Sequence, residues 1–171
     1  MTTEASLRKR SDRDSGDMTP VVLAPVGDSP RAAATSELAC LVARQRAARI
    51  EFVYLIEVPR SLSLEAPFEE ANAAAARALG TAQGVAERYA VPVGTSAYRA
   101  RSASRALLLA AEAHHPDLIV IGSGTRLTDG DWAQVAEQLA QRVPCEVIVD
   151  RLPNGPARGY HPAGGESSQE D

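Results

Sequence analysis

One short segment constrains the fold of this chain more than any other. Residues 117–125 read Asp-Leu-Ile-Val-Ile-Gly-Ser-Gly-Thr. The apolar run is continuous rather than alternating, as in a parallel strand that helices cover on both faces. It ends in a Gly-Ser-Gly turn, and a helical pattern follows. Because α/β folds place ligands, often phosphates, at such turns, the segment raises the question of whether this one holds a phosphate.

Strand-like and helical patterns alternate along the rest of the chain. We expect strands at 21–26, 49–58, 91–98, 117–122 and 145–149. We expect helices from Ser29-Pro30 onward, at 66–89, from Ser102 or Ser104 to His114-His115, and at 131–142. This order implies a parallel sheet with helices on both faces and right-handed crossovers.

The two ends of the chain differ from its middle. Residues 1–18 are polar and charged, and residues 153–171 are rich in Gly, Pro, Ser and Glu. Neither can bury enough apolar surface to offset its ordering entropy. We therefore expect two disordered tails around a single domain at 19–152. The N-terminal residues lack the apolar stretch of a signal peptide, and no apolar run is long enough for membrane insertion.

Charge and cysteine content exclude some classes of function. The formal net charge is −4, which argues against non-specific binding of nucleic acid. Cys40 and Cys145 lack the spacing of a metal site. Reduced thiols in a cytoplasmic protein are the simpler interpretation.

Three segments together resemble the universal stress protein family. Val21 to Ser29 resembles that family's first strand and turn, Asp117 to Gly122 its Asp-Leu-Ile-Val-Met-Gly strand, and residues 135–147 its final helix and fifth strand. The match spans about residues 19–151. The resemblance implies a single-domain, open, five-stranded parallel sheet in order 3-2-1-4-5, a Rossmann-like fold of the adenine nucleotide alpha hydrolase type. It also implies a homodimer, here through the edge strand at 146–150, and an unknown protein partner in the stress response.

ATP-binding members of the family carry a glycine motif that this chain matches only in part. The motif is Gly-x-x-Gly, nine residues, then Gly-Ser or Gly-Thr. Gly122 fits the first glycine, but the second falls at Thr125, with Gly124 one residue early. Ala133-Gln134 stands where Gly-Ser belongs. An alanine there adds a Cβ where the backbone must approach a phosphate closely.

The other residues of a variant nucleotide pocket follow from the same resemblance. The family's adenine-side aspartate comes directly after Pro-Val. Here Gly27 follows Val26, and Asp28 comes one residue later. Arg101 stands near a pocket-lining glycine of the family, and Arg126 lies in the loop after Gly122. Arg101 would fill the pocket, pair with Asp28 or Asp129, or bind an anion, and we favour filling or pairing.

Carboxylates near the last helix add to the case against triphosphate. Asp129 and Asp131 flank the expected start of that helix. They would satisfy its free N–H groups and repel a triphosphate unless a metal intervened.

No catalytic or metal-binding constellation is recognisable in the chain. His114-His115 has no third ligand spaced near it, and a histidine at a helix end commonly interacts with the helix dipole. Ser123 stands in Gly-Ser-Gly, which is not a nucleophile elbow. Paired carboxylates, a zinc motif and a P-loop are all lacking, so we expect neither an enzyme nor a metal site.

Three hypotheses remain. The first is a dimeric regulatory or interaction module of the stress response that lacks the standard ATP-binding motif and needs no cofactor. The second is a nucleotide-binding sensor, for ATP or AMP, whose variant pocket is built from Val26, Gly27, Asp28, Gly122, Gly124 and the arginines. The third, an enzyme of the related superfamily, has the least support.

Overall fold

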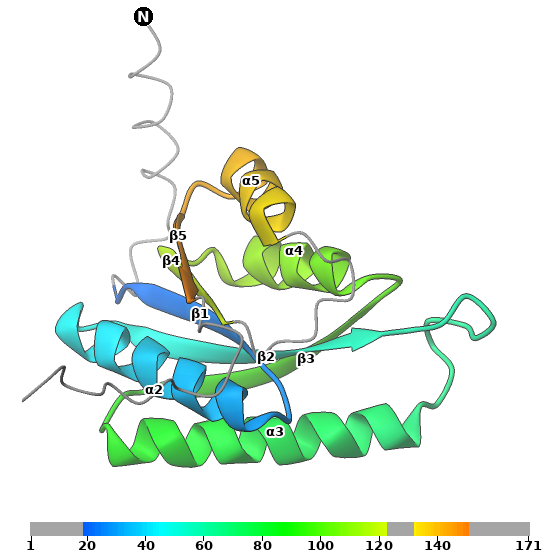
Figure 1. Ribbon diagram of the computed structural model, residues 1–171, viewed down its shortest axis with the longest axis horizontal. Helices are drawn as coiled ribbons and strands as arrows, with labels where there is room; N and C mark the ends of the chain where they lie inside the picture. The colour runs from blue at the N-terminus through cyan, green and yellow to red at the C-terminus, as the bar shows by residue number, and fades with distance from the viewer. Residues whose placement is uncertain (1–18, 123–131, 151–171) are drawn as a thin grey trace, which may run out of the picture.

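The computed structural model describes residues 19–122 and 132–150, which form a central sheet with helices on both faces (Figure 1). The sheet is five-stranded and parallel, in the order β3-β2-β1-β4-β5. Its strands are β1 (Val21–Val26), β2 (Arg49–Glu57), β3 (Val93–Ala100), β4 (Leu118–Gly122) and β5 (Glu146–Asp150). The expected fold class and strand order are confirmed.

Two helices cover each face of the sheet. Helices α2 and α3 pack on one face, whereas α4 and α5 pack on the other (Figure 1). The bounds are α2 (Pro30–Gln45), α3 (Glu69–Arg88), α4 (Ala103–His114) and α5 (Trp132–Arg142). None of these helices has a stretch that is long and apolar enough to cross a membrane. The expected tails lie outside the described residues.

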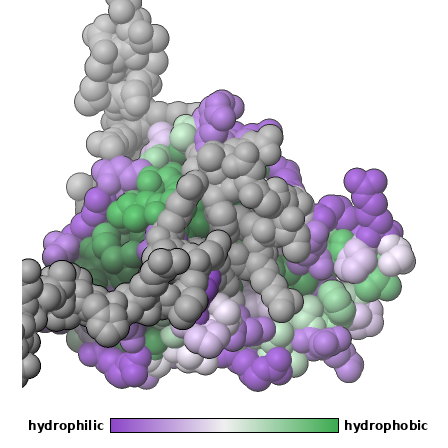
Figure 2. Space-filling model, in the orientation of Figure 1, coloured by the Kyte–Doolittle hydropathy of each residue, from purple (hydrophilic) through white to green (hydrophobic). Residues whose placement is uncertain are grey.

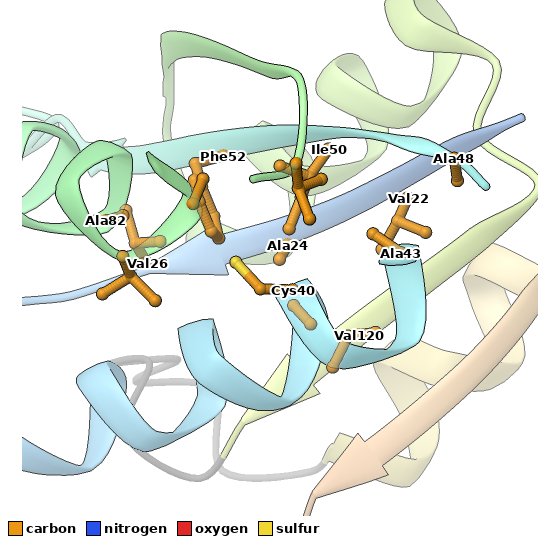
Figure 3. Close-up of a cluster of buried hydrophobic side chains, with 14 of the residues drawn as sticks. Val22, Ala24, Val26, Cys40, Ala43, Ala48, Ile50, Phe52, Ala82 and Val120 are labelled. Carbon is orange, nitrogen blue, oxygen red and sulfur yellow. The ribbon is translucent and has the colours of Figure 1, made fainter. Parts of the chain in front are cut away.

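The continuous apolar runs form the two central strands. Every residue of β1 and of β4 is buried. Val22 of β1 pairs with Ile50 of β2 on one side and with Leu118 of β4 on the other. One core cluster lies under α2 and α3, where Cys40 of α2 points toward Phe52 and Ala24 lies beside Phe52 on the neighbouring strand (Figure 3). A second cluster lies under α4 and α5.

Serine side chains begin two of the helices. Ser29 Oγ accepts a hydrogen bond from the Ala32 N–H (3.3 Å). Ser102 Oγ accepts one from the Arg105 N–H (3.2 Å), so Ser102 rather than Ser104 is the N-cap of α4. Both satisfy donors that a helix N-terminus leaves free. Helix α3 begins at Glu69 instead of at the expected Ala66, because Pro67 disfavours a helical conformation for the residue before it.

Three helices end in a left-handed residue that is not glycine. Ala47, Ala90 and His115 have φ angles of 49°, 53° and 45°. They follow α2, α3 and α4 and precede the strands β2, β3 and β4. Glycine usually occupies this position, because a Cβ is unfavourable there.

The glycine at the end of β4 allows α2 to pack closely on the sheet. A Cβ built on Gly122 would lie 2.6 Å from Thr35 Cβ and 2.5 Å from Thr35 Cγ2. Thr35 is in α2 and is 2% exposed. The space that this glycine leaves free is therefore filled by a helix side chain.

A buried polar cluster lies where β2, β3 and the end of α4 meet. Glu51 is 5% exposed. Its Oε1 accepts a hydrogen bond from Ser96 Oγ (3.0 Å) and lies 3.6 Å from His114 Nε2. Tyr98 Oη lies 2.8 Å from the same nitrogen. The histidine that we expected to act through the helix dipole thus also takes part in a side-chain network.

Two further residues complete the surroundings of this carboxylate. Arg49 Nη1 lies 3.5 Å from Glu51 Oε2. Gly94 is the register partner of Glu51 across the two strands, and a Cβ there would overlap the carboxylate. A buried charge is tolerated only when it is paired and hydrogen-bonded, and Glu51 meets that condition.

Adding a methyl group at the end of β4 tests the packing of α2. We expect Gly122→Ala to lower the free energy of unfolding by about 1–3 kcal/mol, because the new Cβ overpacks the site against Thr35. Gly80→Ala is the control: nothing lies within 4 Å of a Cβ there. In a helix interior that change should raise stability by about 0.5–1 kcal/mol. Urea unfolding of both variants measures the difference, and equal effects would contradict the packing role.

Removing one hydroxyl tests the polar cluster. We expect Ser96→Ala to lower the free energy of unfolding by about 1.5–3 kcal/mol, because Glu51 loses a hydrogen bond to a buried charge. Thr95→Ala, at the exposed neighbouring position, should change it by less than about 0.5 kcal/mol. Chemical denaturation would disprove the structural role of Ser96 if the two variants were equally stable.

Candidate functional site

Two adjacent cavities lie beside the carboxyl ends of β1 and β2. The first, of about 280 Å³, lies between α2 and α3 and is lined by Val26, Gly27, Asp28, Ser36 and Arg77, among others. The second, of about 410 Å³, is bounded by the end of β2 and the first turns of α3. Open α/β sheets bind their ligands at the carboxyl ends of the strands, so this is the position where a site is expected.

Asp28 and Arg77 line both cavities and so mark the place where they meet. Asp28 lies two residues after the end of β1 and directly precedes Ser29, the N-cap of α2. Tyr54 Oη donates to Asp28 Oδ2 over a long distance of 3.5 Å. The exposed carboxylate therefore keeps acceptor capacity for a hydroxyl or amine group of a ligand.

Arg77 brings a positive charge to the same place from α3. Its side chain is exposed and forms no ion pair with any residue of 19–122 or 132–150. A guanidinium offers five N–H donors in a fixed plane, which suits a carboxylate or a phosphate. One acceptor-rich group and one donor-rich group thus face the same space.

The second cavity is acidic and partly aromatic. Glu57 and Glu70 line it together with Asp28, whereas Arg77 is the cation among its lining residues. Tyr54 and Phe68 add aromatic surface. Such a cavity suits a flat, hydrogen-bond-donating group better than a group with several negative charges.

The structure brings together some of the residues that the sequence singled out. Val26, Gly27 and Asp28 all line the first cavity. Gly122 lines neither cavity, and its missing Cβ is explained by Thr35. Gly124, Thr125, Arg126 and Asp129 lie outside the described residues.

Arg101 is placed differently from what we expected. It lines neither cavity and forms no ion pair with Asp28. Instead, Nη1 donates to the carbonyl oxygens of Pro59 (2.6 Å), Leu62 (2.8 Å) and Val58 (3.3 Å). The expected pairing with Asp28 is therefore not formed, and Nη1 donates to these carbonyl groups instead.

Sequence reasoning missed Arg77 and Tyr54. Tyr54 carried no signal, since an aromatic residue in a strand is usual. Arg77 carried a weak one: it is the one charged residue between Glu70 and Glu87 in an alanine-rich helix. A single charged residue in such a helix could have been singled out as a candidate binding residue.

The two thiols and the acidic groups offer little reactive chemistry. Burial raises the pKa of both Cys40 and Cys145 to about 11, so few of these thiols are ionised at neutral pH. Within residues 19–122 and 132–150, no three His, Cys, Asp or Glu side chains lie close enough to hold a metal ion.

Comparison with solved structures finds the same fold in other proteins. A universal stress protein family member from Burkholderia pseudomallei is 22% identical, with a TM-score of 0.59 over 78% of this chain and 97% of that one. The universal stress protein of Archaeoglobus fulgidus in complex with dAMP is 19% identical, with a TM-score of 0.59 over 78% and 98%. An Arabidopsis thaliana family member with AMP bound is 12% identical, with a TM-score of 0.56 over 81% and 97%.

Comparison with family models gives a match over nearly the whole folded part. No curated protein matches the chain. The model described as the universal stress protein family matches residues 18–151, which include every strand and helix described above. The chain therefore belongs to the universal stress protein family.

Proposed function

We propose that this protein is a non-catalytic regulatory module of the stress response that binds a nucleoside monophosphate, of the AMP class, and acts as a homodimer. The observation that carries the proposal is the pair of cavities that meet at Asp28 and Arg77 beside the carboxyl end of β1. The residues that line the two cavities supply charged and hydrogen-bonding groups suited to binding, and on that ground we favour a sensor over an enzyme.

The charges of the site favour one phosphate over three. Among the residues that line the second cavity, one guanidinium, Arg77, stands against three carboxylates, of Asp28, Glu57 and Glu70. A single phosphate would pair with Arg77, whereas further phosphates would meet the carboxylates. The ribose hydroxyls or the amine of the base would donate to Asp28.

The partial glycine motif supports the same choice. Gly122 is needed where Thr35 packs, so its presence does not require a phosphate. Thr125 and Ala133 replace two glycines of the family's ATP motif. Two proteins of the same fold have structures with a nucleoside monophosphate, the Archaeoglobus fulgidus protein with dAMP and the Arabidopsis thaliana protein with AMP.

The edge strand β5 supports the dimer. β5 pairs with β4 on one side and forms one edge of the sheet. Ile148 of β5 and Val42 of α2 are only partly buried at the margin of the first core cluster, and Leu41 of α2 is 46% exposed. Figure 2 shows hydrophobic surface over the region where Figure 1 places β5 and α2. A second copy would cover this surface.

Calorimetric titration with AMP and ATP tests the ligand. We expect AMP to bind, and ATP to bind no more tightly than AMP. Asp28→Asn and Arg77→Gln should each weaken AMP binding by about tenfold or more, because each replaces a charge-assisted hydrogen bond with a neutral one. Glu112→Gln, at an exposed position of α4 on the opposite face, is the control and should bind as the unchanged protein does. Absence of binding at millimolar AMP would refute the proposal.

Proline substitution at the two sheet edges tests the dimer. The Glu146 N–H bonds to Asp117 toward β4, so the N–H of Val149 points away from β4. We expect Val149→Pro to shift the protein from dimer to monomer in sedimentation, because it removes an outward donor. Ala97→Pro, on the opposite edge in β3, should remain dimeric. A wild-type protein that is monomeric at high concentration would sink this part of the proposal.

A further inference from the structure

The connection between β2 and α3 is a long exposed segment with an unusual attachment. We call residues 59–66 the strap. Its residues 59–65 are exposed and 66 is half-buried. Two of them, Leu62 and Leu64, are large apolar side chains with exposed fractions of 38% and 36%. Burial therefore contributes little to its position, and such segments ordinarily open easily.

Arg101 holds the first half of the strap from the end of β3. Its Nη1 donates to the carbonyl oxygens of Pro59 and Leu62 within the strap and to that of Val58 just before it, at 2.6, 2.8 and 3.3 Å. The Val58 N–H in turn donates to the Ala100 carbonyl (2.8 Å), which continues the pairing of β2 with β3. The strap is thus bound where the two strands end.

Arg99 holds the second half from the same strand. Nη1 donates to the carbonyl oxygens of Ala66 (2.9 Å) and Leu64 (3.3 Å). Nη2 donates to Asn72 Oδ1 (2.7 Å) in the first turn of α3. One side chain therefore joins β3, the strap and the start of α3.

These contacts are made with neutral groups. Within the described residues, neither guanidinium lies at ion-pair distance from a carboxylate. The pKa of Glu65 is lowered, chiefly by its hydrogen bond from Ser63 and then by its own backbone N–H, with Arg101 nearby as a weaker cause. Arg99 reaches its three acceptors through two nitrogens, Nη1 and Nη2, a fork geometry that lysine lacks.

The ends of the strap are walls of the second cavity. Glu57 precedes it, Phe68 follows it, and both line that cavity. Phe68 also packs against the buried cluster of Ile56, Val58 and Ala75. Displacement of the strap would move both walls, because each lies within two residues of it.

We propose that Arg99 and Arg101 are positioning residues that hold the strap on β3 and thereby fix the cavity wall at which the nucleoside of the ligand binds. This inference rests on the proposed function for the identity of the ligand. It does not depend on that function for the clamp itself, which is a property of the unliganded chain.

Hydrogen exchange on the full chain tests the clamp without a ligand. The amides of Leu62 and Ala66 are hydrogen-bonded to the Pro59 and Ser63 carbonyls within the strap. In Arg99→Gln/Arg101→Gln we expect the exchange of peptides covering 58–68 to rise about tenfold or more, while peptides from β1 stay unchanged. Arg105→Gln, which removes one positive charge in the first turn of α4, is the control for each single substitution and should leave both unchanged. Unchanged exchange in the strap would overturn the proposal.

Affinity for AMP tests the consequence for the cavity. We expect the double variant to bind AMP about tenfold or more weakly, and Arg99→Lys to fall near Arg99→Gln, because a single ammonium nitrogen cannot replace the two guanidinium nitrogens that Arg99 uses. If exchange in the strap is accelerated but the affinity for AMP is unchanged, the two arginines do not fix the cavity wall at which the ligand binds. If the wild-type protein binds no AMP, the proposed function fails. The exchange experiment still shows whether Arg99 and Arg101 hold the strap. Should the double variant fail to fold, Arg99→Gln alone and Arg101→Gln alone are measured by exchange in its place.

Discussion

The close packing of α2 on the β1–β4 pair is the constraint on which the other features depend. Both strands are buried throughout, so a helix must cover each face. The missing Cβ of Gly122 lets Thr35 reach the backbone of β4. This contact fixes the N-terminal half of α2 beside the carboxyl end of β1. Asp28 lies between these two elements, and its place in the cavities follows from their packing.

Most of the fold follows from local patterns that the sequence displays openly. The apolar runs 21–26 and 118–122 became the two fully buried strands, because a strand covered on both faces has no polar side to show. Ser29-Pro30 begins a helix as expected, because the serine side chain caps a free N–H group and proline suits the first helical position. The order of the strands came from the resemblance to a family, since periodicity does not distinguish one arrangement of parallel strands from another.

The site was less predictable, because its residues act through partners distant in the sequence. Arg101 has the chemistry of an anion-binding residue, yet carbonyl groups some 40 positions earlier, near Pro59, take its donors. Glu51 interrupts an apolar strand, and its partners Ser96 and His114 come from two other elements. Gly122 was assigned to phosphate approach, whereas its neighbour is Thr35. In each case the residue type marked the position as unusual, but the sequence did not indicate which residue it would contact.

The left-handed alanines at the ends of α2 and α3, and the histidine at the end of α4, bear on the order in which the molecule assembles. A non-glycine residue in that conformation is unfavourable by about 1 kcal/mol on its own, so an isolated helix has little reason to end there. Ala47 and Ala90 adopt it where the next strand turns back into the sheet. We therefore expect these turns to take their final shape only once β2 and β3 have docked.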